Sequence, residues 1–114
     1  MALSFAEVPG ARGVQGTIRE TFYDVTLDSS YPTAGYAIGA QNVGLASIFG
    51  VELLGQSLTT GAAPTTLYGV SWDQVNGKLQ LFQDLAVAAA APFGEVANAT
   101  NVATRKLRLR FVGI

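Results

Sequence analysis

The side chains able to do chemistry in this 114-residue chain are few, because it contains neither histidine nor cysteine. These absences remove the Ser-His-Asp triad, the thiolate nucleophile, the imidazole switch and metal sites built on Cys or His. A carboxylate pair or a desolvated lysine remains, drawn from eight acidic residues and from Lys78 and Lys106. The acids Asp24, Asp28, Asp73 and Asp84 fall at strand ends and turns, where Asp bonds its own backbone, and no EF-hand spacing occurs. We therefore expect no catalytic residue, no cofactor and no metal site, and we expect that the protein is not an enzyme.

The most unusual pattern is a basic stripe formed by Lys106, Arg108 and Arg110, which alternate with apolar residues near the end of the sequence. On a strand, these three cations line one face about every 7 Å. Three interpretations stay open: a solvated outer face whose like charges discourage edge-to-edge aggregation, a surface for an acidic protein partner, and a contact with phosphates. Because the net charge is −1, no global field attracts nucleic acid or a membrane, and we expect neither as a partner.

A second pattern is the aromatic pair Tyr68 and Trp72, which share one face of an expected strand. Such a pair can form a platform for a sugar ring. Alternating aromatic residues more often pack a core or a subunit interface. Both interpretations stay open, and the core or interface is favoured.

Alternation of apolar and polar residues predicts the strands that must position these side chains. The expected strands are residues 17–27, 48–54, 67–73, 78–83 and 104–114. Asn76-Gly77 predicts the turn of a hairpin, and residues 31–47, 56–66 and 93–100 are expected to be irregular. Residues 84–91 suit either a short helix or an ordered loop of small residues. Short strands, 13 glycines and no βαβ alternation predict an all-β single domain, an antiparallel β-sandwich or barrel with long loops.

The first sixteen residues show no hydrophobic period and include the linker-like run PGARG at 9–13. We expect an extended N-terminal arm over residues 1–16, ordered only where it lies on something, followed by a β-domain over residues 17–114. Glu7 stands where a signal peptide would be apolar, and the longest apolar stretch, 45–54, is about half of a membrane span. The sequence therefore predicts a soluble protein.

Three segments together resemble small structural proteins of tailed bacteriophages. Residues 25–37, VTLDSSYPTAGYA, are similar to the family's "DSSYPTGG" opening, and VGL at 43–45 matches the "GL" that follows it. The run WDQVNGKL at 72–79 is similar to the "YD..NGKLK" unit, and EVANAT at 95–100 with the last strand is similar to "EVANGTD…VRVLAIG". The likeness spans about residues 24–114 with gaps at 56–66 and 84–93, and it departs at Ala34, where the family has a second glycine.

The resemblance implies a virion structural protein, a head decoration (cement) protein that binds the outer surface of the major capsid protein shell, commonly as a homotrimer. Such a protein is made in the host cytoplasm and carries no catalytic residues. Composition agrees, since 13% charged residues is half the usual quarter, which suits contact with other protein. An alternative is another virion component, a tail or head-surface spike protein that displays Tyr68 and Trp72 to a host glycan. The expected partner contacts are Leu3, Phe5, Pro9 and Arg12 of the arm and Lys106, Arg108 and Arg110 of the basic stripe.

Overall fold

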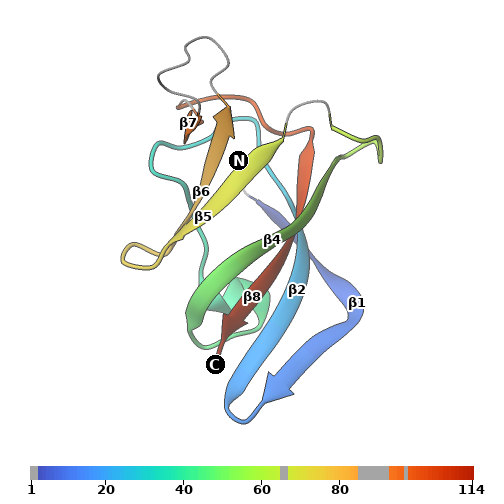
Figure 1. Ribbon diagram of the computed structural model, residues 1–114, viewed down its shortest axis with the longest axis vertical. Coiled ribbons are helices and arrows are strands. Elements are labelled where there is room, and N and C mark those ends of the chain that lie inside the picture. The colour runs from blue at the N-terminus through green and yellow to red at the C-terminus, as the bar shows by residue number, and fades with distance from the viewer. Residues whose placement is uncertain (1–2, 65–66, 85–92, 97) are drawn as a thin grey trace.

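Two antiparallel sheets pack face to face in the computed structural model (Figure 1), which describes residues 3–64, 67–84, 93–96 and 98–114. One sheet has the strand order β1-β2-β8-β4, and the other has the order β3-β6-β5, with β7 also paired to β6. The predicted all-β antiparallel sandwich is confirmed. The elements are β1 (Ser4–Gln15), β2 (Ile18–Thr26), β3 (Tyr36–Ala37), the 3₁₀ helix η1 (Ala40–Val43), β4 (Ile48–Leu58), β5 (Tyr68–Asp73), β6 (Lys78–Asp84), β7 (Phe93–Glu95) and β8 (Arg105–Gly113).

Strand β8 is the centre of the four-stranded sheet, because it pairs with β2 on one side and with β4 on the other. Its alternating sequence places Leu107, Leu109 and Phe111 at 0% exposure in the core, as the pattern predicted. Burial of each such side chain contributes about 1.5–3 kcal/mol relative to exposure. The same alternation directs the basic stripe to the outer face of this sheet.

The N-terminal segment differs from the expected arm, because Ser4–Gln15 forms β1, an edge strand paired with β2. The pairing shifts where residues 8–11 of β1 lie opposite Phe22 alone. Pro9 and Gly10, with φ 73° at Gly10, suit the two central positions of a type II turn. This turn kinks the strand (Figure 1) and interrupts the side-chain alternation, which explains why the sequence showed no period.

The hairpin of β5 and β6 is confirmed, with its turn at residues 74–77. The Asp73 carboxylate accepts hydrogen bonds from the backbone N–H groups of Val75 and Asn76, at 3.1 and 3.2 Å, and Gly77 has φ 66°. Strand β4 extends into the region expected to be a loop, and β7 lies in the loop expected at 93–100. The helix or loop expected at 84–91 falls, except for the β6 residue Asp84, outside the described residues.

A tyrosine cluster, defined as Asp28, Tyr31, Tyr36 and Glu95, joins the long crossing to the second sheet. The Tyr31 hydroxyl donates to the Glu95 carboxylate at 2.7 Å and accepts from the Leu81 N–H at 3.1 Å. The Tyr36 hydroxyl donates to Asp28 at 2.8 Å, and the two rings meet edge to face with centroids 5.4 Å apart. Burial is the main cause that raises the pKa of both tyrosines. The cluster thus unites two of the segments that carry the bacteriophage resemblance.

Candidate partner-binding surface

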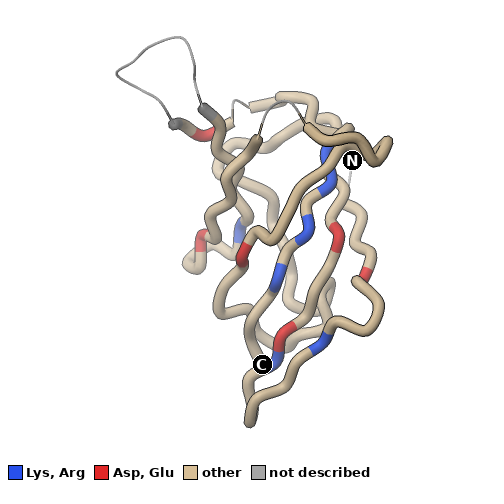
Figure 2. The backbone as a smooth tube through the Cα atoms, turned by 45° about the vertical axis from the view of Figure 1, so that its right-hand side comes forward, with Lys and Arg blue, Asp and Glu red and all other residues tan. Residues whose placement is uncertain are grey.

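The outer face of the four-stranded sheet carries most of the charged side chains of its strands. The second sheet covers only the inner face, and residues that alternate with the core point outward. Figure 2 shows basic residues following β8 along the sheet with acidic residues on the strands beside it. We call this surface the charged face and define it by Glu20, Asp24, Glu52, Lys106, Arg108 and Arg110.

Two cations of the basic stripe are already paired within the sheet. Arg108 donates through Nε and Nη2 to both carboxylate oxygens of Asp24, at 2.8 and 2.9 Å. Arg110 donates to Glu20 and lies 3.5 Å from Glu52. The hydrogen bond from Arg108 holds the pKa of Asp24 below its ordinary value, and the carboxylates raise the pKa of both arginines. The stripe faces outward as predicted, but Arg108 and Arg110 do not present uncompensated charge.

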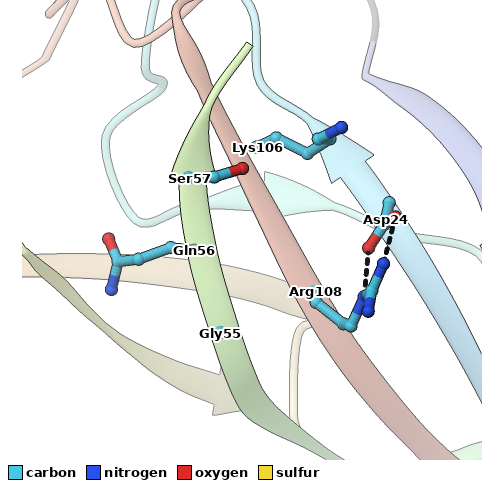
Figure 3. Close-up of a pocket in the computed structure, with 6 residues that line it drawn as sticks. All are labelled: Asp24, Gly55, Gln56, Ser57, Lys106 and Arg108. Atoms are coloured by element: carbon cyan, nitrogen blue, oxygen red, sulfur yellow. Dashed lines mark hydrogen bonds and ion pairs between the residues drawn. The ribbon is translucent and has the colours of Figure 1, made fainter. Parts of the chain in front are cut away.

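Lys106 differs from these two arginines, because its ammonium forms no ion pair with any residue that the structure describes. It lines a basic groove with Asp24, Ser57, Arg108 and the backbone at Gly55 (Figure 3). A Cβ atom added at Gly55 would meet nothing within 4 Å, so the groove is open there. The Ser57 side chain extends on the Lys106 side of β4 (Figure 3). Gln56 also borders the groove, but its amide extends on the other side of β4.

The expected contacts of the N-terminal arm divide into buried and exposed residues. Leu3 and Phe5 pack against the core, and the Phe5 ring meets Tyr23 edge to face at 6.4 Å. Pro9 and Arg12 are exposed on β1, where Arg12 donates to Glu7 at 2.6 and 3.1 Å. The arginine hydrogen bond lowers the pKa of Glu7. Because Leu3 and Phe5 are partly buried against the core, they stabilise the sandwich, and their expected contact with a partner stays a prediction.

The same sheet has an apolar end that local sequence patterns did not predict, defined as Val14, Ile18, Phe49 and Ile114. Their exposed fractions are 70%, 43%, 50% and 43%. The registers place Ile18 next to Ile114 on the outer face of the sheet, whereas Val14, paired with Arg19, lies on the opposite face of the β1–β2 hairpin. Phe49 lies beside Gly113 at the irregularity of β4. The β1–β2 hairpin and the C-terminus lie together at one tip of the 46 Å long axis (Figure 1). The only sequence signal was that Ile18 lies out of phase with the inward residues of β2.

The aromatic pair on β5 packs inward, as the favoured interpretation predicted. Tyr68 and Trp72 both lie against the core. The Gln56 side chain from β4 exchanges two hydrogen bonds with the Tyr68 backbone, at 2.9 and 3.0 Å. The Arg105 guanidinium lies 4.6 Å above the Tyr68 ring and donates to Gln56 at 2.7 Å. Tyr68 is therefore a contact between the two sheets.

Within residues 3–64, 67–84, 93–96 and 98–114, no group of three or more acidic side chains is placed to hold a metal ion. In the same part of the chain, no helix has the length and apolar character needed to cross a membrane. Comparison with protein-family models, with curated proteins and with solved structures found no match to this chain.

Proposed function

We propose that the protein is a virion structural protein of a tailed bacteriophage that decorates the capsid and stabilises the shell of major capsid protein. The observation that carries this proposal is the apolar end beside the charged face. An isolated molecule leaves four large apolar side chains of one sheet in water there, and such exposed patches commonly mark protein contacts. The sequence resemblance over residues 24–114 supplies the identity of the partner.

The stabilisation follows from preferential binding. A protein that binds the assembled shell more tightly than free subunits shifts the equilibrium toward the shell. At a free concentration 100 times Kd this linkage amounts to about 2.7 kcal/mol for each site. The apolar end supplies the buried area, and the ion pairs of the charged face orient the sheet on the lattice.

The resemblance indicates that copies associate as homotrimers on the outer capsid surface after synthesis in the host cytoplasm. The charged face and the apolar end belong to one sheet, so one partner can contact both. Pro9 and Arg12, at and beside the β1 kink, border this sheet, which makes them a secondary contact. No covalent chemistry is involved.

A binding measurement with empty mature shells tests the proposal. We expect the purified protein to co-sediment with shells at a fixed stoichiometry, and light scattering gives its oligomeric state in solution. The double variant Ile18→Ser/Phe49→Ser should bind at least about tenfold more weakly, since each buried apolar side chain contributes on the order of 1.5–3 kcal/mol.

Val75 provides the matched control, because it is 85% exposed in the turn of the β5–β6 hairpin, on the other sheet. Val75→Ser should bind shells as the unmodified protein does. Val75→Ser should leave the denaturation midpoint unchanged. Ile18 and Phe49 are 43% and 50% exposed, so the double variant should lower the midpoint, and its binding is measured under conditions in which it remains folded. Failure of the unmodified protein to bind shells, or unchanged binding by the double variant, would overturn the proposal.

A further inference from the structure

The charged face has one position where positive charge is left without a partner. Arg110 lies between two carboxylates, and Arg108 engages Asp24 through two hydrogen bonds. Lys106 has no ion-pair partner among the described residues, and its field on Asp24 is a minor cause of that residue's lowered pKa. The six charges of the face therefore sum to zero, with one excess negative charge around Arg110 and one excess positive charge at the basic groove.

Three side chains that line the basic groove, Ser57, Lys106 and Arg108, carry hydrogen-bond donors, and Asp24 is the one carboxylate beside them. Asp24 accepts one N–H of Nε and one of Nη2 of Arg108, which leaves three of the five N–H groups of Arg108 without a hydrogen bond to the described residues. The Lys106 ammonium has three N–H donors and the Ser57 hydroxyl has one. These side chains project from neighbouring strands, with Gly55 beside them (Figure 3). Ammonium, guanidinium and hydroxyl groups together form a site for a negatively charged oxygen ligand.

We propose that the basic groove binds a single carboxylate, the Asp or Glu side chain of an acidic segment on a protein partner. The charge of the groove selects this ligand over phosphate. Two cations and the Asp24 carboxylate leave one net positive charge, which matches a monoanion. Inorganic phosphate near neutral pH carries about two charges, so Asp24 would repel it more strongly than it repels a carboxylate. Only the naming of the partner as the capsid protein rests on the proposed function.

A titration of the isolated protein tests the site without any capsid. Backbone amide shifts are recorded by NMR at low salt while a hexaglutamate peptide is added, with hexaglutamine as the uncharged comparison. We expect shifts centred on Ser57, Lys106 and Arg108 with hexaglutamate alone, and they should weaken as salt screens the charges. Lys106→Gln should reduce the affinity at least about fivefold.

Two further variants separate charge from shape. Gly55→Val leaves every charge in place but fills the open floor, and it should also weaken hexaglutamate binding at least about fivefold. Lys78→Gln is the matched control, because Lys78 is the other lysine of the chain and begins β6 on the second sheet. The Lys78→Gln variant should bind hexaglutamate with the same affinity as the unmodified protein.

The possible results distinguish this inference from the proposed function. Shifts located elsewhere, equal losses in Lys106→Gln and Lys78→Gln, or tighter binding of inorganic phosphate than of hexaglutamate would overturn the carboxylate site. A groove that binds hexaglutamate while the protein ignores shells would leave the site standing and refute the capsid partner. If the protein binds shells equally well with and without Lys106→Gln and does not bind hexaglutamate, the capsid partner stands and the carboxylate site is refuted.

Discussion

The tyrosine cluster and the charged face both pair carboxylates with hydrogen-bond donors, but in opposite surroundings. In the cluster, Tyr31 is 0% and Asp28 6% exposed, and the bonds lie between the two sheets or beneath the crossing loop. On the charged face, the Arg108 side chain is 53% exposed, and its bond to Asp24 joins directly paired residues of neighbouring strands.

This difference in burial decides what each group of bonds contributes. A buried polar group that loses its partner bears the desolvation cost alone, about 1–3 kcal/mol. An exposed ion pair is screened by water and salt, so its loss changes stability little. The tyrosine cluster therefore maintains the fold, whereas the charged face remains available for binding.

Two glycines provide the sharpest test of this comparison. Gly35 precedes Tyr36 with φ 106°, and a Cβ atom there would lie 2.5 Å from the Leu79 carbonyl oxygen. Gly35→Ala should lower the free energy of unfolding by about 3 kcal/mol, through overpacking and backbone strain. Gly55→Ala, in the open groove, should change it by less than about 0.5 kcal/mol. Urea denaturation measures both, and similar losses at the two positions would contradict the comparison.

Removing one hydroxyl should have the next largest effect. Tyr31→Phe leaves the Leu81 N–H and the Glu95 carboxylate without their partner, so the free energy of unfolding should fall by about 2 kcal/mol. Tyr23→Phe is the control, since the Tyr23 ring packs against Phe5 and Phe111 and its hydroxyl makes no hydrogen bond with the described residues. If both variants lose the same stability in urea, the cluster bonds have no special role.

Local patterns in the sequence were sufficient to predict most of the fold. The alternation of apolar and polar residues predicted β8 and β2, and Asn76-Gly77 predicted the β5–β6 turn. Both signals depend only on neighbouring residues. The kink at Pro9 in β1 was missed because a turn inside a strand erases the period of two. The Tyr31–Glu95 bond was also invisible, since contacts between distant segments leave no local pattern.

The candidate surface was predictable only in part. The outward direction of Lys106, Arg108 and Arg110 followed from period two. The sequence did not predict which of the three cations form ion pairs, because the pairing of Arg108 with Asp24 depends on the register of β2 with β8. The apolar end required the three-dimensional arrangement as well, since Ile18 and Ile114 are neighbours only through that register.

The tyrosine cluster and the charged face should lose their contributions to stability at opposite ends of the pH range, with moderate changes in the free energy of unfolding. Burial raises the pKa of Tyr31 and Tyr36 above 10.0, so their contribution is complete below about pH 10 and is lost as the pH rises through the raised pKa. The pKa of Asp24 is lowered below 3.8, so its contribution is present above that pH and is lost as the pH falls through the lowered pKa.

Unfolding free energies measured across pH should therefore show a loss above pH 10 that is smaller in Tyr31→Phe, because one of the two titrating groups is absent. Asp24→Asn should reduce the loss of stability only on the acid side, where Glu7 and Asp73, whose pKa values are also lowered, still titrate. An alkaline loss that is identical in Tyr31→Phe and the unmodified protein would show that the buried hydroxyl does not titrate with unfolding.

The smallest expected effect is the coupling between Asp24 and Arg108, measured by a double-mutant cycle with Asp24→Asn, Arg108→Gln and the double variant. Because the pair is exposed, the coupling should change the unfolding equilibrium by less than about fivefold and should shrink as salt is added. A large, salt-independent coupling would mean that this ion pair holds the fold as the tyrosine cluster does. The charged face would then be committed to stability, and the groove beside it would have less freedom to adapt to a partner.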